Sequence, residues 1–231
     1  MALLEDLENE VEKIFEEKWT TRNGTVVPNS EDIKFGNEAV KLNGTVLYAD
    51  LSGSTNLVDT QKNYFATEIY KSYLHSAAKI IRSEGGIITA YDGDRIMAVY
   101  LGNSKNTCAG KTAFKINYTV FHIINPAIKI QYPNSEYQIE QVVGIDTSEL
   151  WVAKTGIRGS NDLVWVGRAA NYAAKLSSLN PSFATNITKE VYEKLHKSMK
   201  ISNDEEHMWN ESKWSDMNSS IIYRSNWWWG I

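Results

Sequence analysis

The chain of 231 residues is long enough for one large domain with additions, and its composition, 42% hydrophobic and 23% charged, is typical of a globular protein. Its formal net charge of -4 argues against a nucleic-acid polymer as the main partner, although a single nucleotide needs only a local positive site. One cysteine excludes an internal disulfide, the acidic start is unlike a signal peptide, and no apolar run reaches membrane-spanning length, so we expect a cytoplasmic protein.

Residues 1–40 are expected to form a helix followed by a turn-rich connector, WTTRNGTVVPNSED. Six apolar residues recur at helical spacing among acidic ones over residues 2–18: Leu3, Leu4, Leu7, Val11, Ile14 and Phe15. The apolar side chains of such a stripe are normally buried against another surface. The stripe is expected either to pack on the sheet of its own chain, which is the commoner arrangement, or to join two copies of the chain.

Residues 41–200 are expected to form one domain of mixed strands and helices, and residues 201–231 a C-terminal extension that holds a last strand over 221–224. The expected elements are a strand over 45–50, a helix over 65–82, hairpin strands over 87–91 and 95–100, a helix over 108–124 that ends before Pro126, strands over 138–146 and 150–155, a helix over 168–179, and a strand end at Ile187 and Thr188 that caps a short helix reaching Leu195. This mixture predicts an α+β sandwich, with helices packed on a largely antiparallel sheet.

Two aspartates stand where expected strands end. Asp50 closes the apolar stretch TVLYAD, and Asp94 follows the turn of the hairpin AYDGDRIMAVY. If the hairpin lies beside the first strand, both carboxylates converge at one edge of the sheet and form an oxygen site for Mg²⁺ or Mn²⁺. The following loop, Ser52, Gly53, Ser54 and Thr55, offers backbone N–H groups to a phosphate. Taken singly, each aspartate is equally well interpreted as a residue that caps or flanks a turn.

Three motifs in order carry a resemblance: DLSGST after an apolar strand, GDRIMAVY after a hairpin turn, and VGRAANYAAKL further on. Over roughly residues 40–195 the chain resembles the class III nucleotidyl cyclase catalytic domain. The resemblance implies a ferredoxin-like sandwich with active sites between two protomers. It also implies two ions, Mn²⁺ or Mg²⁺, held by Asp50, Asp94 and the carbonyl of Leu51. In that family a 3′-hydroxyl attacks the α-phosphate of a nucleoside triphosphate, and pyrophosphate leaves a 3′,5′-cyclic nucleotide.

The helix expected at VGRAANYAAKL carries Asn171 and Lys175 on one face, because they are four residues apart. The resemblance implies that Asn171 orients the ribose. It places an arginine one turn later, where this chain has Lys175. A lysine supplies the same positive charge to the α-phosphate but lacks the bidentate fork of an arginine. The other interpretation is an exposed polar stripe. Arg224 is a further candidate cation for the triphosphate.

The positions that read a purine in this family are apolar here, Ala90 and Val164. A purine edge would leave its polar atoms unpaired in such a pocket. Either the pocket serves a smaller pyrimidine, or base reading is lost while a nucleotide is still bound. Tyr48 and, more weakly, Arg95 and Asp162 are candidates for the base edge, although Tyr48 is equally well interpreted as a core aromatic.

The whole chain resembles the stand-alone bacterial pyrimidine cyclases of anti-phage defence (Pycsar), most clearly in WTTRNGTVVP and GIRGSNDLVWVGRAANYAAKLSSL. That likeness implies a homodimer that converts UTP or CTP to cyclic UMP or cyclic CMP on infection, and a separate effector protein that senses the product. Two alternatives stay open at this point: a cyclase-fold module that binds nucleotide without turnover, and an atypical adenylate or guanylate cyclase whose base is read by backbone groups.

Overall fold

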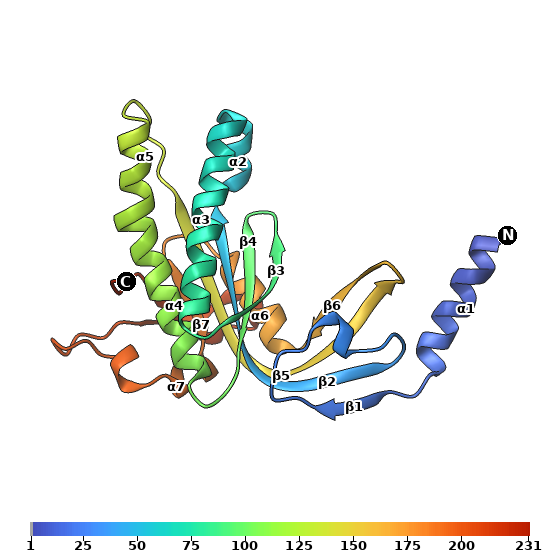
Figure 1. Ribbon diagram of the computed structural model, residues 1–231. Coiled ribbons are helices and arrows are strands. Elements are labelled where there is room, and N and C mark those ends of the chain that lie inside the picture. The colour runs from blue at the N-terminus through green and yellow to red at the C-terminus, as the bar shows by residue number, and fades with distance from the viewer. Residues whose placement is uncertain (1) are drawn as a thin grey trace.

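The computed structural model describes residues 2–231 (Figure 1). Its strands are β1 Thr20–Asn23, β2 Glu38–Ser52, β3 Ile87–Asp92, β4 Arg95–Tyr100, β5 Glu140–Ile157, β6 Ser160–Val166, β7 Thr185–Thr188, β8 Asn210–Trp214 and β9 Ser220–Ser225. Its α-helices are α1 Ala2–Glu16, α2 Ser54–Thr60, α3 Asn63–Ser83, α4 Lys105–Thr119, α5 Asn125–Gln131, α6 Arg168–Ser177 and α7 Lys189–Lys194. A π-helical turn, Val120–Ile124, joins α4 to α5, and short 3-10 turns lie at Ser30–Asp32, Lys197–Met199 and Ser215–Met217.

The sheet runs in the order β3-β4-β2-β5-β7-β9-β8, with β1 beside β2 and β6 beside β5. Its pairs are antiparallel except β1 with β2 and β5 with β7. The two longest strands, β2 and β5, pair from Ala39 with Ala153 to Ser52 with Glu140. One half of this long ribbon lies inside the helical body, and the other half leaves it as an arm that β1 and β6 widen (Figure 1).

Alternate residues of β2 face two different cores, as the two-residue period of a strand requires. Leu47, Ala49 and Leu51 pack with α3 and α4 in the larger core. Val46 and Tyr48 belong to the opposite core, which α6 covers with its small residues Ala169, Ala170 and Ala173. Asp50 therefore lies on the face of the sheet that α6 occupies.

Some expected elements differ from those observed. The strands expected over 138–146 and 150–155 are one continuous strand, β5, and β1, β6 and β8 were not anticipated. Pro126 does not lie beyond a helix end, because it occupies the first turn of α5, directly after the π-helical turn that joins α4 to α5. Thr188 precedes α7, but its hydroxyl donates to Asp146 and makes no cap bond to the helix.

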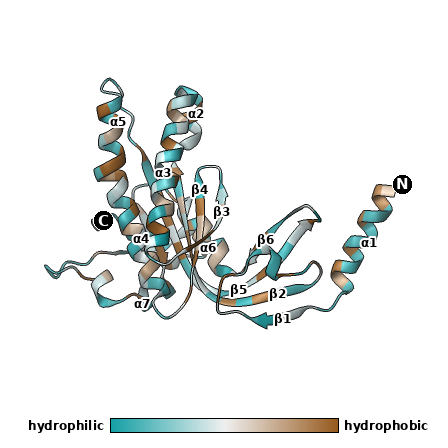
Figure 2. Ribbon diagram, in the orientation of Figure 1, coloured by the Kyte–Doolittle hydropathy of each residue, from teal (hydrophilic) through white to brown (hydrophobic). Residues whose placement is uncertain are grey.

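The expectation that the N-terminal helix covers its own sheet is wrong. No residue of α1 is buried, and the helix stands apart from the body at the far end of the arm (Figure 2). None of the helices in residues 2–231 combines the length and the apolar character that crossing a bilayer requires.

Candidate active site

Asp50 and Asp94 lie together at one edge of the sheet. Asp50 is next to the end of β2 and pairs across the strands with Arg95, the first residue of β4, so the hairpin turn that carries Asp94 lies beside it. A pocket of about 400 Å³ opens here. Its lining comprises Asp50, Leu51, Ser52, Gly53, Ser54, Thr55, Asp94, Arg95, Ser177, Ser178 and Leu179.

The charges in this pocket are unbalanced. Burial, and then the neighbouring Asp94, raise the pKa of Asp50 to about 7. Arg95 opposes this shift only weakly, because its Nε is 3.9 Å from Asp50 Oδ2 and its Nη2 is also 3.9 Å from Asp92 Oδ2. Two carboxylates that repel each other in a half-buried pocket favour a cation between them.

A divalent ion fits this donor set. Asp50 and Asp94 supply hard oxygen ligands. The Leu51 side chain is buried in the core on the opposite face, so Leu51 lines the pocket through its backbone. Within residues 2–231 no group of three or more His, Cys, Asp or Glu side chains is placed to hold a metal. An ion bound here would therefore need further oxygens, such as those of a phosphate.

The loop after β2 turns sharply to line the same pocket. Gly53 adopts φ +71°, a left-handed conformation that glycine reaches without strain, and it precedes the first residue of α2. Ser52, Gly53, Ser54 and Thr55 thereby line the pocket beside the carboxylates.

Asn171 and Lys175 are exposed on α6 and do not line the pocket of their own chain. The end of this helix does reach it, through Ser177 and Ser178, which the sequence analysis missed. Asn171 is seven residues before Ser178, about 10 Å along a helix axis. Lys175 Nζ is 3.6 Å from Met217 Sδ, so it points toward the C-terminal extension. One chain thus assembles the carboxylates, but not the helix residues, around this pocket.

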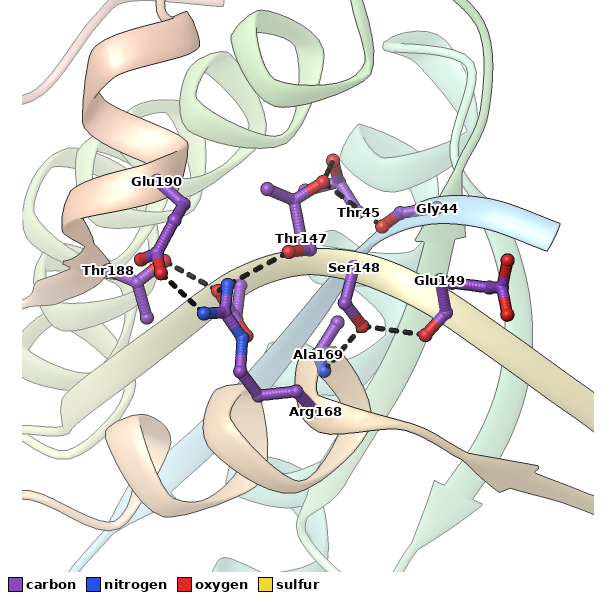
Figure 3. A network of polar contacts seen from close by, with 10 residues as sticks. Gly44, Thr45, Thr147, Ser148, Glu149, Arg168, Ala169, Thr188 and Glu190 are labelled. Atoms are coloured by element: carbon purple, nitrogen blue, oxygen red, sulfur yellow. Dashed lines mark hydrogen bonds and ion pairs between the residues drawn. The ribbon is translucent and has the colours of Figure 1, made fainter. Parts of the chain in front are cut away.

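An ionic network around the buried Asp146 holds the start of α6 on β5 (Figure 3). Arg168 donates from Nε and Nη2 to the two carboxylate oxygens of Asp146, at 3.0 and 3.1 Å, and from Nη1 to Glu190. Burial raises the pKa of Asp146, while the Thr188 hydroxyl and Arg168 oppose that shift. These partners are 22 residues apart along the chain, so their pairing had no local signal in the sequence.

Close packing completes the placement of α6. A Cβ added to Gly144 of β5 would lie 2.1 Å from the carbonyl oxygen of Ala173 and 2.4 Å from the amide nitrogen of Ser177. Only glycine allows the helix backbone to approach the strand this closely. The helix that carries Asn171 and Lys175 is therefore fixed to the strand next to the one that carries Asp50.

The residues proposed to read the base fall into two groups. Tyr48 pairs with Met97, and Met97 with Ala90, in one row across the sheet, next to the row that holds Asp50 and Arg95. Burial raises the pKa of Tyr48. Val164 lies apart from them on β6, in the arm, with its side chain 39% exposed.

The structure does not bring Arg224 to this pocket. Its Nε donates to Asn186 Oδ1 at 2.9 Å, and its guanidinium lies 4.5 Å from the centre of the Phe183 ring. Both partners belong to the neighbourhood of β7 rather than to the edge where Asp50 and Asp94 meet. The contact predicted between Arg224 and the triphosphate is therefore not supported within one chain.

The comparisons with known proteins agree with this fold. No family model matches the sequence. A uridylate cyclase from Xanthomonas perforans is 50% identical over 232 residues, and one from Burkholderia cepacia is 51% identical over 233 residues, each match covering 100% of both chains. Among solved structures, the adenylyl cyclase CyaB from P. aeruginosa is similar with a TM-score of 0.66 and 20% identity, over 81% of this chain and 95% of that chain. The predicted class III cyclase fold is confirmed.

Proposed function

Because the chain belongs to the uridylate cyclase family of nucleotide cyclases, we propose that it converts UTP to 3′,5′-cyclic UMP and pyrophosphate, with its catalytic groups within residues 41–200. The observation that carries this proposal is the pocket in which Asp50, Asp94 and the loop Ser52 to Thr55 meet. It combines ligands for a divalent ion with a backbone wall for phosphate, which cyclisation of a nucleoside triphosphate requires. CTP is the other pyrimidine substrate that the site is compatible with.

Asp50 and Asp94 would hold the metal, two Mn²⁺ or Mg²⁺ ions by the resemblance, with the Leu51 carbonyl as a further ligand. Bound there, divalent ions neutralise phosphate charge and make the 3′-hydroxyl more acidic. Asp50, which the bound cation would keep ionised, is also proposed to accept the proton of that hydroxyl. The 3′-oxygen then forms a bond to the α-phosphorus while the bond to the pyrophosphate oxygen breaks.

Asn171 and Lys175 are proposed to complete the site from a second copy of the chain. Asn171 would orient the ribose by hydrogen bonds, and Lys175 would stabilise the negative charge that develops on the α-phosphate. This assignment is supported by their exposure on α6 and by the fact that neither residue lines the carboxylate pocket of its own chain. A symmetric pair has two such sites, because each copy offers both halves.

The row formed by Tyr48, Met97 and Ala90 is proposed to hold the pyrimidine. Neighbouring rows on one face of a strand are about 7 Å apart, a spacing that lets the phosphates lie at Asp50 and the base at Tyr48. The apolar Ala90 offers no partner for a purine edge, and the Tyr48 hydroxyl offers one to a pyrimidine. Arg95, which lies in the row of Asp50, could contact either the base or a phosphate.

The proposal is tested by incubating the purified protein with ATP, GTP, CTP and UTP together in the presence of Mn²⁺ and identifying the products by mass spectrometry. Cyclic UMP as the main product, absent with Asp50→Ala, is the expected result. Cyclic CMP would move the assignment to the other pyrimidine, and cyclic AMP or GMP would show that the interpretation of Ala90 and Val164 is wrong. Tight nucleotide binding without any product would favour a sensor.

The biological role rests on the resemblance alone. We propose that the cyclic nucleotide is a second messenger made during phage infection and sensed by a separate effector protein. Cells that carry Asp50→Ala should lose protection against phage while the protein still accumulates to the level of the unaltered chain. If these cells stay fully protected, then the activity of the enzyme is not required for defence.

A further inference from the structure

The N-terminal helix α1 carries an apolar stripe that nothing in its own chain covers. Leu4, Leu7, Val11 and Ile14 follow one another at spacings of three and four residues, and their side chains are 50–61% exposed. Leu3 and Phe15 flank this stripe and are 70% and 85% exposed. A contiguous apolar surface of this kind marks an interaction site in a soluble protein.

The projecting position of α1 is built into the fold. Asn37, which is 7% exposed, donates from Nδ2 to the carbonyl oxygens of Ile14 and Glu17 at 2.7 and 2.6 Å, so it caps the last turn of the helix. The Asn37 carbonyl in turn accepts from Thr20 N–H at 2.7 Å, next to the pairing of β1 with β2. These bonds hold the helix at the start of the β1–β2 pairing, where no part of its own chain buries the stripe.

The charge of α1 restricts which kind of molecule can bind its apolar stripe. Its sequence, ALLEDLENEVEKIFE, holds six acidic residues and one lysine. An amphipathic helix that binds an anionic membrane carries basic residues on its polar face, and nucleic acid selects the same sign. Both are disfavoured here, which leaves a protein surface.

We infer that α1 of each protomer packs its stripe, Leu4, Leu7, Val11 and Ile14, against a second copy of this chain. The inference rests on the homodimer proposed above, whose site is incomplete in one chain because Asn171 and Lys175 do not line the carboxylate pocket. The arm, which carries α1 at its end, leaves the body on the side of the β3–β4 hairpin, and α1 stands apart from the body on that side (Figure 1). Two-fold symmetry would cover both stripes with one kind of contact.

Analytical ultracentrifugation of the full chain tests the inference. Leu7→Asp with Val11→Asp should raise the dimer dissociation constant about 100-fold or more, because two apolar side chains lose their cover in each protomer. The matched control, Ala2→Asp with Asn9→Asp, adds the same charge on the opposite face of the helix and should leave the constant within about threefold. An unchanged constant for Leu7→Asp with Val11→Asp, or a monomeric unaltered protein, would overturn the inference.

A second variant tests whether the loss of association comes from the missing stripe and not only from unfolding of α1. Deletion of residues 2–13 removes Leu4, Leu7 and Val11, three of the four stripe residues, but leaves Asn37 and the buried cores intact, so it should produce the same loss of association with unchanged near-ultraviolet circular dichroism. Association is measured without substrate, which separates this inference from the proposed function. An inactive protein whose dimer depends on α1 would contradict only the function, whereas an active dimer insensitive to α1 would contradict only the inference.

Discussion

Arg168 and Asp146 form a bidentate ion pair between the first residue of α6 and the middle of β5, with N–O distances of 3.0 and 3.1 Å. The Asp146 side chain is fully buried, and it also accepts from the Thr188 hydroxyl. We expect Asp146→Asn to lower the free energy of unfolding by about 2 kcal/mol, because a buried charge-assisted contact is lost and Arg168 keeps only Glu190 and the Thr147 carbonyl. Urea unfolding measures this change.

The comparison pair for this experiment is Lys129 and Glu136, which lie 3.1 Å apart with side chains 56% and 93% exposed. Glu136→Gln should change the free energy of unfolding by less than about 1 kcal/mol, since exposed ion pairs contribute little. If Asp146→Asn is as mild as Glu136→Gln, then the network does not anchor α6.

The sequence was sufficient to predict the carboxylate pocket because its signals are local. The DLSGST loop marks a strand end, and the Asp-Gly signal marks a hairpin that brings Asp94 beside Asp50. The prediction that Asp94 follows the turn is wrong by one residue, because Asp92 still pairs with Arg95 and the turn itself is Gly93 and Asp94. The continuity of β5 could not be predicted in the same way. Residues 147–149 separate the two expected strands, but Thr147 Oγ1 donates to the Gly44 carbonyl, and Ser148 Oγ accepts from Ala169 N–H. Partners so distant in sequence appear only in the fold.

The position of α1 could not be predicted from the sequence either. The stripe predicted an amphipathic helix, and α1 is one, but periodicity does not say which surface covers it. The decisive contact is the cap from Asn37 to Ile14 and Glu17, which joins the helix to the start of β2.

The raised pKa of Asp50 predicts a dependence of stability on pH and metal. In the metal-free protein this pKa is about 7, against about 4 in an unfolded chain, so the folded state binds the proton more tightly. The stability from this group is therefore full below about pH 4 and is lost as the pH rises through about 7. A divalent cation favours the ionised carboxylate and should restore what is lost. We expect Mn²⁺ to raise the melting temperature clearly at about pH 8 and hardly at about pH 5.

Calorimetric scans with Mn²⁺ and with a chelator at both pH values make this measurement. Asp50→Asn cannot ionise, so the Mn²⁺ effect at the higher pH should shrink strongly in this variant. An equal rise of the melting temperature at both pH values would mean that the ion binds away from Asp50.

Tyr48 provides a test of base reading. We expect Tyr48→Phe to lower kcat/KM for UTP about tenfold, because one hydrogen bond to the base is lost while the ring still packs beside Met97. The matched control is Tyr91→Phe, on the exposed strand β3 of the same hairpin, where the side chain is 58% exposed and no effect is expected. Steady-state kinetics with UTP and CTP measure both variants. Unchanged kinetics in Tyr48→Phe would assign Tyr48 to packing alone.

The separation of Asn171 and Lys175 from the carboxylates of their own chain predicts complementation between two inactive variants. Asp50→Ala and Lys175→Ala should each be nearly inactive alone. In an equal mixture that exchanges subunits, half of the dimers are mixed, and each mixed dimer holds one intact site of two, so about a quarter of the unaltered activity should return. Mixing Asp50→Ala with Asp94→Ala is the control, because both changes fall on the same half-site and no mixed dimer regains one. Activity that stays absent in the first mixture, despite subunit exchange shown by mass spectrometry, would mean that a single chain closes its own site.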